Sequence, residues 1–200
     1  MPQVIVVSKT RMQTGLCIGG FDLTTNRSLR LLPRQEHAQP VNAPFNIGDV
    51  WEINYELRGS QAPFVEDADA VAVGQRITRR DVAEYVAGHA EIVVGDTNVI
   101  YQGKLHWNTG HKGFIEPADP SGFSTQFWRP TSFLNRYDDS NREGRSVFWE
   151  PETRHRIPWV GVAAPPDRID AGTLVRVSLG RPYAGTEDHP VCWLQLSGVY

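Results

Sequence analysis

A strand-like pattern occurs twice in the chain, and this repeat restricts the fold more than any other feature. Residues 48–55 begin with a glycine and a turn residue and then alternate apolar with polar side chains, and residues 172–179 have the same outline. Such alternation places successive side chains on opposite faces of a sheet, so each copy predicts a half-buried strand. Unless the likeness arose by chance, two copies predict two similar small β domains in tandem.

Other strands are predicted where short β-branched or apolar runs end at glycine, proline or turn residues. They cover residues 4–7, 16–21, 28–32, 70–73, 99–105, 146–149, 157–162 and 191–196. One helix is predicted over residues 79–88, because Thr78 and Asp81 form a capping-box pattern ahead of apolar residues at helical spacing. A mainly β chain with one or two short helices, short strands and frequent Gly and Pro is typical of small barrels of the OB type.

The strongest linker signal is the run of two prolines and a glycine in residues 117–122. We therefore expect a first OB-like barrel over residues 1–116, plugged by the helix, a linker over 117–124, and a second OB-like barrel over 125–200. Within the second barrel, the polar and charged residues 135–146 predict a hairpin or a loop.

The charge of the chain is modest but unevenly distributed. A net charge of −3 argues against binding nucleic acid over the whole surface. The charged residues of segment 1–36 are nevertheless mostly basic, and those of segment 37–75 are mostly acidic. Arginine outnumbers lysine, which suits phosphate and base recognition but would equally follow from a GC-rich genome. The chain shows no signal-peptide pattern and no apolar run long enough to span a membrane, so we expect a soluble, cytoplasmic protein without a membrane partner.

Several short segments carry a likeness to a known family. They are Ser-Lys-Thr-Arg at residues 8–11, Cys-Ile-Gly-Gly at 17–20, Leu-Arg-Leu-Leu-Pro at 29–33, and Leu-Gln-Leu-Ser-Gly at 194–198, which is the most specific. Together they resemble the prokaryotic dual-OB-containing domain, although Leu29 and Val199 stand where members often carry an aromatic residue. The resemblance implies two OB-like barrels and a nucleic-acid-binding or sensing role, often beside prokaryotic defence and conflict systems. It implies no catalytic residue.

OB barrels bind single strands in a basic groove with aromatic side chains on which bases stack. The candidates for such contacts in this chain are Lys9, Arg11, Arg30, Arg34, Trp107, Arg129 and Arg156. For the basic residues near the early strands, the alternative is a set of solvated edge charges. For Trp128 with Arg129, and for Trp159 near Arg156, the alternative is an arginine packed over a tryptophan at a domain junction. Trp51 and Trp193 lie in alternating strands and are expected in the core.

The remaining polar residues do not form a recognisable catalytic or metal site. His106 and His111 lack a third metal ligand at a usual spacing, and no serine or cysteine in a nucleophile-elbow context accompanies Asp188-His189. We therefore predict no metal, no cofactor and no catalytic residue, with Cys17 and Cys192 reduced and buried.

Three hypotheses about function follow. The first is a non-catalytic module that binds single-stranded nucleic acid or a nucleotide. The second is a scaffold that binds a protein partner through its barrel faces. The third is an uncharacterised hydrolase or transferase built around Asp188, His189 or His155.

Overall fold

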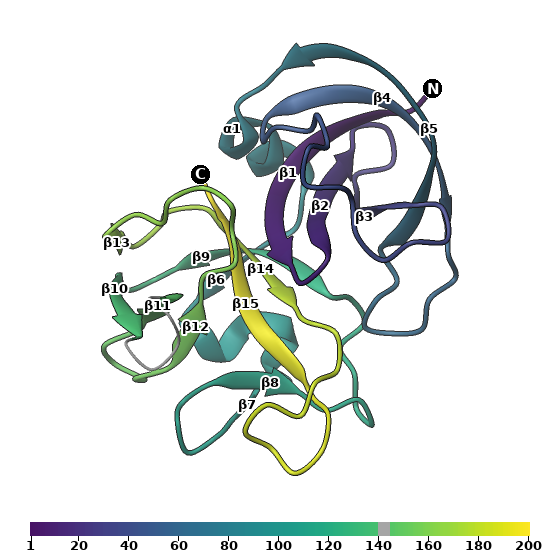
Figure 1. Ribbon diagram of the computed structural model, residues 1–200. Helices are drawn as coiled ribbons and strands as arrows, with labels where there is room; N and C mark the ends of the chain where they lie inside the picture. The colour runs from purple at the N-terminus through teal and green to yellow at the C-terminus, as the bar shows by residue number, and fades with distance from the viewer. Residues whose placement is uncertain (140–144) are drawn as a thin grey trace. The chain divides into compact units, whose positions relative to one another are not determined.

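The computed structural model describes residues 1–139 and 145–200, which form two compact units (Figure 1). The first unit comprises Met1–Ala90 and Gly161–Ala163, and the second comprises Glu91–Val160 and Ala164–Tyr200. The division falls at residue 90 and not at the expected linker, because the segment before residue 117 pairs with strands of the second unit. Residues 117–124 therefore lie inside the second unit.

The first unit is a closed barrel with the strand order β1-β2-β3-β5-β4. Its strands are β1 (Gln3–Met12), β2 (Gly15–Asp22), β3 (Arg27–Pro33), β4 (Asp49–Leu57) and β5 (Asp67–Arg79). All neighbouring pairs are antiparallel except β3 and β5, which run parallel. The alternation in the sequence is what fills the barrel, because the apolar residues of each strand share its inner face. These residues include Val4, Val6, Leu16, Ile18, Leu29, Leu31, Ile53 and Ala68.

Three residues that are distant in sequence complete the edge of β1. The strand pairs with β4 only through residues 3–5. Farther along, the backbone oxygen of Lys9 accepts a hydrogen bond from the backbone N–H of Val162 at 2.9 Å, and Thr10 forms an isolated bridge with Gly161. The Val162 side chain packs against the barrel core. Residues 161–163 thus satisfy backbone groups that β4 leaves unpaired, which is why they belong to the first unit.

The far half of β5 is an exposed strand edge. The pairing with β3 stops at Ala70, because β3 ends at Pro33, which has no backbone donor. Among the described residues, no other strand pairs with this edge of β5 beyond Ala70. Irregular pairing with β4 and the charges of Arg76 and Arg79 discourage addition of another strand here. The exposed apolar residues on this half are Val71, Val73 and Ile77.

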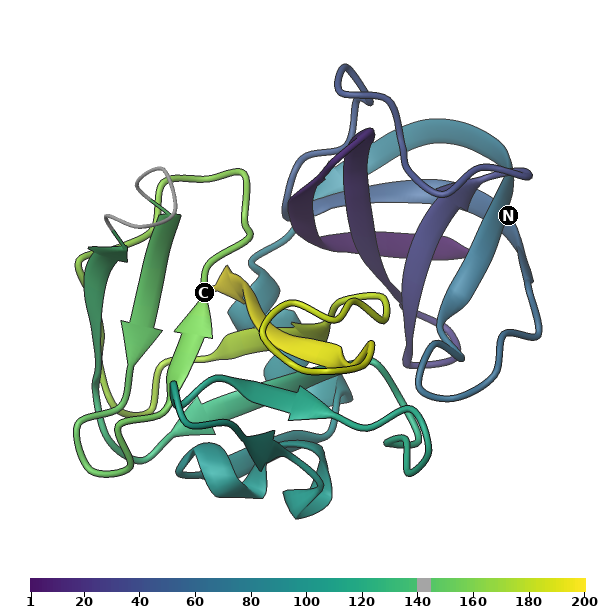
Figure 2. The same cartoon turned by 60° about the horizontal axis from the view of Figure 1, so that its bottom comes forward.

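The second unit contains two sheets (Figure 2). A four-stranded sheet has the order β12-β11-β10-β13, with β10 (Leu134–Asp139), β11 (Arg145–Trp149), β12 (Arg156–Pro158) and β13 (Arg168–Ile169). A six-stranded sheet has the order β6-β9-β14-β15-β8-β7, with β6 (Ile92–Gly95), β7 (His106–Trp107), β8 (Gly113–Ile115), β9 (Thr125–Pro130), β14 (Val175–Leu179) and β15 (Cys192–Val199). A parallel bridge between Trp159 and Leu196 joins the chain after β12 to β15. The result is a curled, partly open barrel.

The two copies of the repeated sequence occupy corresponding positions. In the first barrel β4 pairs antiparallel with β1 and with the following strand, β5. In the second, β14 pairs antiparallel with β9 and with the following strand, β15. Gly48 and Gly172 precede these strands with φ of 88° and 78°, in the left-handed region that favours glycine. The prediction of two tandem OB-like barrels is confirmed.

Several elements differ from the predictions. The predicted strand over residues 99–105 is wrong, because Asp96 caps a 3₁₀ helix, η1 (Thr97–Gly103), and Tyr101 and Gln102 have positive φ. The predicted strand over 157–162 is limited to β12, and the one over 70–73 extends to the thirteen residues of β5. The expected hairpin over 135–146 exists as β10 paired with β11, with residues 140–144 outside the described part of the chain.

The helix α1 (Val82–His89) begins one turn later than predicted. Residues up to Arg79 remain in β5, where Thr78 pairs with Val50. Asp81 caps the helix, and its carboxylate accepts a hydrogen bond from the backbone N–H of Glu84 at 2.8 Å. No helix in the described residues is long and apolar enough to cross a membrane.

The position of the cap can be tested by paired substitutions. We expect Asp81→Ala to lower the free energy of unfolding by about 1 kcal/mol, because it removes the acceptor for a first-turn N–H. Thr78→Ala should change it by less than about 0.5 kcal/mol, as for other exposed sites. Urea denaturation of both variants measures the difference, and an equal or larger loss in Thr78→Ala would contradict the assignment.

Candidate functional site

A groove of about 550 Å³ opens on the second unit. Strands β10, β11 and β12 line one side of it, and β15 with the β14–β15 loop lines the other. The groove contains three aromatic and three basic residues, which are Tyr137, Tyr183, Trp193, Lys112, Arg145 and Arg156. OB barrels bind their ligands on the face of the second and third strands and on the loop between the last two. In the second barrel β9 corresponds to the first strand, because it pairs with β14 as β1 pairs with β4. The next strands, β10 and β11, correspond to the second and third, so the groove lies at the place where OB barrels bind their ligands.

The aromatic residues of the β14–β15 loop and of β15 hold each other in place. The indole N–H of Trp193 donates to the backbone oxygen of Tyr183 at 2.8 Å, and Tyr183 pairs with Val191. Gly185 packs closely on the indole, since a Cβ there would lie 3.0 to 3.1 Å from three ring atoms. Trp193 was expected in the core, but it is half-buried and supports the loop. The Tyr183 side chain is 68% exposed beside the groove.

Tyr137 and Arg156 form a pair on the opposite side of the groove. The guanidinium of Arg156 lies 5.7 Å from the centroid of the Tyr137 ring, a separation typical of a cation–π contact. Burial raises the pKa of Tyr137, although Arg156 acts in the opposite direction, so the phenol stays protonated at neutral pH. A hydrogen bond from the Arg156 backbone N–H to the His111 oxygen at 2.8 Å fixes β12 against the neighbouring loop.

The groove also contains carboxylates. Asp138 and Asp139 line it beside the cations. Asp138 accepts a hydrogen bond from Ser146 at 2.8 Å and lies 3.7 Å from the Arg136 guanidinium. The positive potential of the groove is therefore moderate.

Next to the groove, Trp107 stacks on His155. Their ring centroids are 3.5 Å apart and the planes differ by 5°. The Thr97 hydroxyl lies 2.6 Å from His155 Nδ1 and 2.7 Å from the carboxylate of Glu150, which is fully buried. Glu150 also accepts hydrogen bonds from Ser132 and Thr153 hydroxyls and from the Thr97 backbone N–H. Sequence reasoning missed this network, because its members come from separate segments.

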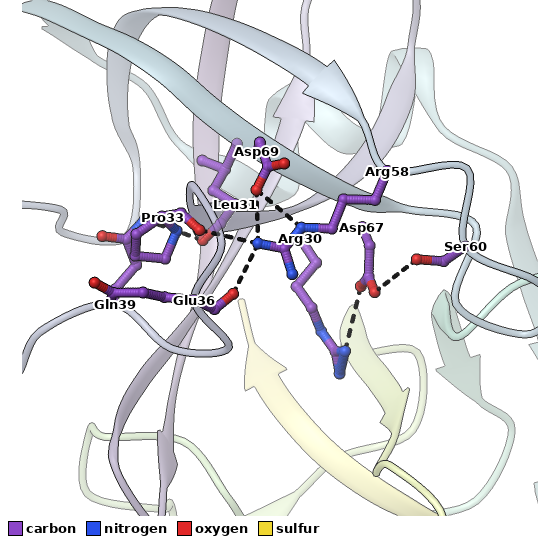
Figure 3. Close-up of polar contacts among 9 residues, drawn as sticks. All are labelled: Arg30, Leu31, Pro33, Glu36, Gln39, Arg58, Ser60, Asp67 and Asp69. Carbon is purple, nitrogen blue, oxygen red and sulfur yellow. Dashed lines mark hydrogen bonds and ion pairs between the residues drawn. The ribbon is translucent and has the colours of Figure 1, made fainter.

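Two of the four basic candidates of the first barrel, Arg30 and Lys9, contact groups of their own barrel. Arg30 is buried, with its guanidinium 3.3 Å from the carboxylate of Asp67 (Figure 3). The guanidinium also lies 5.3 Å from the centroid of the Phe64 ring. The ammonium of Lys9 donates to the backbone oxygens of Phe45 and Ala43 at 3.0 and 3.4 Å. Arg11 and Arg34 are exposed.

A second arginine, Arg58, fastens two loops of the first barrel. Its guanidinium lies 2.6 Å from the carboxylate of Asp69. The same group donates hydrogen bonds to the backbone oxygens of Pro33 and Glu36 (Figure 3). These bonds hold the loop after β3 in place. Gln39 reaches back to the oxygen of Leu31 at 3.2 Å. Arg58 and Gln39 thus stabilise the barrel to which they belong.

The remaining candidates have structural contacts. Arg129 donates to the backbone oxygen of Gly172 at 2.7 Å. Trp128 is fully buried and donates to the Gly95 oxygen, so it is not available for stacking. Trp51 packs against the first core, as predicted. Trp159 lies edge-on to Phe148, with 6.2 Å between ring centroids.

The residues considered for catalysis or metal binding have separate partners. His189 is exposed and pairs with Glu116 at 2.8 Å, whereas His155 contacts Thr97. Cys192 is buried, and burial raises its pKa to about 11, while Cys17 is half-buried. Among residues 1–139 and 145–200, no group of three His, Cys, Asp or Glu side chains could hold a metal ion.

The contribution of the Arg30–Asp67 ion pair to the free energy of unfolding can be tested by substitution. Asp67→Ala should lower the free energy of unfolding by about 3 kcal/mol, because it leaves a buried guanidinium without its carboxylate. The double variant Arg30→Met with Asp67→Ala should recover most of this loss. Urea denaturation measures both, and a double variant as unstable as Asp67→Ala would contradict the explanation.

The environment of His155 predicts how the free energy of unfolding depends on pH. Burial lowers its pKa, although Glu150 acts in the opposite direction, and His111 and Asp96 are its other charged or titratable neighbours. The unfolded chain, with an ordinary histidine pKa of about 6.5, therefore binds the proton more readily than the folded chain. The free energy of unfolding should fall as pH drops through about 6.5, and His155→Asn should show a smaller fall. Identical pH profiles from urea denaturation at pH 7.5 and 5 would contradict this.

Comparison with known proteins agrees with this architecture. The family model described as Dual OB-containing domain matches residues 2–199. The searches of curated proteins and of solved structures gave no match. The match covers nearly the whole chain and includes both barrels, so this chain belongs to the dual OB-containing domain family.

Proposed function

We propose that the second barrel binds single-stranded nucleic acid, without catalysis, in the groove between β10–β12 and the β14–β15 loop. The observation that carries this proposal is the composition of the groove, which combines three aromatic and three basic residues at the ligand-binding position of an OB barrel. Aromatic rings supply stacking surfaces for bases, and cations neutralise phosphates.

The exposed ring of Tyr183 favours a single strand over a duplex. Stacking on a side chain requires a base face that is not already covered by neighbouring bases, and single strands offer such faces. The indole of Trp193 and the turn at Gly185 hold the backbone of the Tyr183 loop, so little conformational freedom is lost when a base binds.

Arg156, Arg145 and Lys112 supply the charge for the phosphate backbone. Each phosphate contact releases counterions, so affinity should fall as salt rises. The carboxylates of Asp138 and Asp139 limit this attraction, and we expect moderate affinity with a shallow salt dependence. A free nucleotide, which has the same base and phosphate chemistry, is the simplest competitor.

The scaffold hypothesis has one supporting observation, the exposed apolar residues on the far half of β5. The irregular pairing and the arginines of that strand oppose the docking of another strand. The groove is therefore the better-supported site. The family resemblance adds to our proposal a sensing role beside prokaryotic defence systems.

The proposal is tested by removing one groove cation. We expect Arg156→Ala to weaken binding of a fluorescent oligothymidylate about tenfold, and to reduce the slope of log affinity against log salt by about 0.7, the value for one phosphate contact on a single strand. Fluorescence anisotropy across a salt series at constant pH measures both quantities.

The matched control is Arg168→Ala. Arg168 also lies over an aromatic ring, 4.0 Å from the centroid of Phe133, in the same unit but not in the groove. It should bind like the wild type. No binding by the wild-type protein to single-stranded DNA or RNA at low salt, or equal losses in both variants, would refute the proposal.

A further inference from the structure

We propose that the hollow at Trp107 is a second base-stacking subsite, so that a bound strand continues from the groove, past Lys112, onto the indole. This inference rests on the proposed function. It concerns a surface that the groove does not include, and it predicts how affinity depends on the length of the strand.

The hollow has a volume of about 480 Å³ and adjoins the groove. Lys112 and Thr186 line both cavities, so the two share a wall within the second unit. Trp107, Asn108 and Glu187 line the hollow and not the groove. A strand leaving the groove beside Lys112 therefore enters the hollow directly.

The indole of Trp107 is held in a fixed orientation. His155 covers one face at 3.5 Å, and the short contact of His155 with the Thr97 hydroxyl anchors the imidazole to the buried Glu150 network. The same indole lines the hollow, although Gly113 packs against its six-membered ring, where a Cβ would lie 2.9 Å from the nearest ring atom. The part of the indole that is open to the hollow is the surface that a base would contact. A ring fixed in this way loses little entropy on binding.

The loop that carries Lys112 is also fixed. The side-chain oxygen of Asn108 accepts hydrogen bonds from the backbone N–H groups of Gly110 and Lys112, both at 3.0 Å. Its side-chain nitrogen donates to Glu187 at 3.0 Å and to Thr186 at 3.1 Å, which ties this loop to the β14–β15 loop. Asn108 thus keeps the wall between the cavities in place and engages the carboxylate of Glu187.

The position of Lys112 suits the phosphate between the two bases. A lysine ammonium is a compact charge on a flexible stem and binds phosphate without a fixed geometry. One base would stack at Tyr183 in the groove, the next part of the strand would pass Lys112, and a later base would stack on Trp107. The groove alone holds the shortest ligands, whereas longer strands use both subsites.

The test is a length series of oligothymidylates, from a mononucleotide to about eight residues, measured by anisotropy competition. Wild-type affinity should rise in a step when the strand becomes long enough to reach Trp107. In Trp107→Ala this step should be lost, about tenfold for the longest strand, with the affinity of the shortest ligands unchanged. Tyr183→Ala should weaken binding at every length, and Trp107→Phe should keep most of the step.

A second measurement does not depend on the alanine variant folding. Long strands should quench tryptophan fluorescence more than short ones, and Trp107→Phe should remove this additional quenching. If Trp107→Phe shows the same additional quenching as the wild type, or if the length step survives in folded Trp107→Ala, the subsite is wrong and the groove proposal stands. If no strand of any length binds the wild type, the proposed function itself fails.

Discussion

Closure of each barrel depends on a parallel contact that involves its last strand. In the first barrel, residues 30–33 of β3 pair with residues 67–70 of β5, and the buried Arg30–Asp67 ion pair lies on this seam. In the second barrel the corresponding contact is the bridge between Trp159 and Leu196, with a hydrogen bond from Val160 to the Leu196 oxygen. Beside this shorter seam, residues of β10–β12 and of β15 line the groove. The candidate site therefore accompanies the weaker closure of the second barrel.

The uneven charge of the sequence is resolved within the first unit. Arg30 of the basic N-terminal segment pairs with Asp67 of the acidic segment, and Arg58 and Arg76 engage Asp69 and Asp49. These ion pairs offset part of the one-sided field that the linear distribution of charge predicts. The cations of the groove lie instead in the second half of the chain, where the charge pattern of the sequence gives no signal.

The fold was largely predictable because strand alternation is a local property. The repeated pattern correctly predicted that β4 and β14 are strands. The expectation that the second copy is half-buried is wrong, because Arg176 on its polar face is buried as well. The strand predicted over residues 99–105 failed, because the cap at Asp96 and the positive φ of Tyr101 outweigh β-branched composition. Sequence reasoning selected Arg156 because it precedes Trp159, and Trp107 because it lies in a polar, glycine-containing loop. Tyr137, Tyr183 and Lys112 were not selected, because they meet only after distant strands pair, and no local signal marks them.

The segment 161–163 also determines how the molecule can be divided. The chain builds the first barrel, passes through most of the second, contributes three residues to the edge of β1, and then returns to finish the second barrel. Neither barrel is therefore an independent cassette. After a single cut at residue 90, the C-terminal fragment would still contain Val162, which donates a hydrogen bond to Lys9 of β1. Residues 1–90 produced alone would lack this hydrogen bond. Duplication can explain two similar barrels, but once the return segment had formed, gene rearrangement could move them only as one piece.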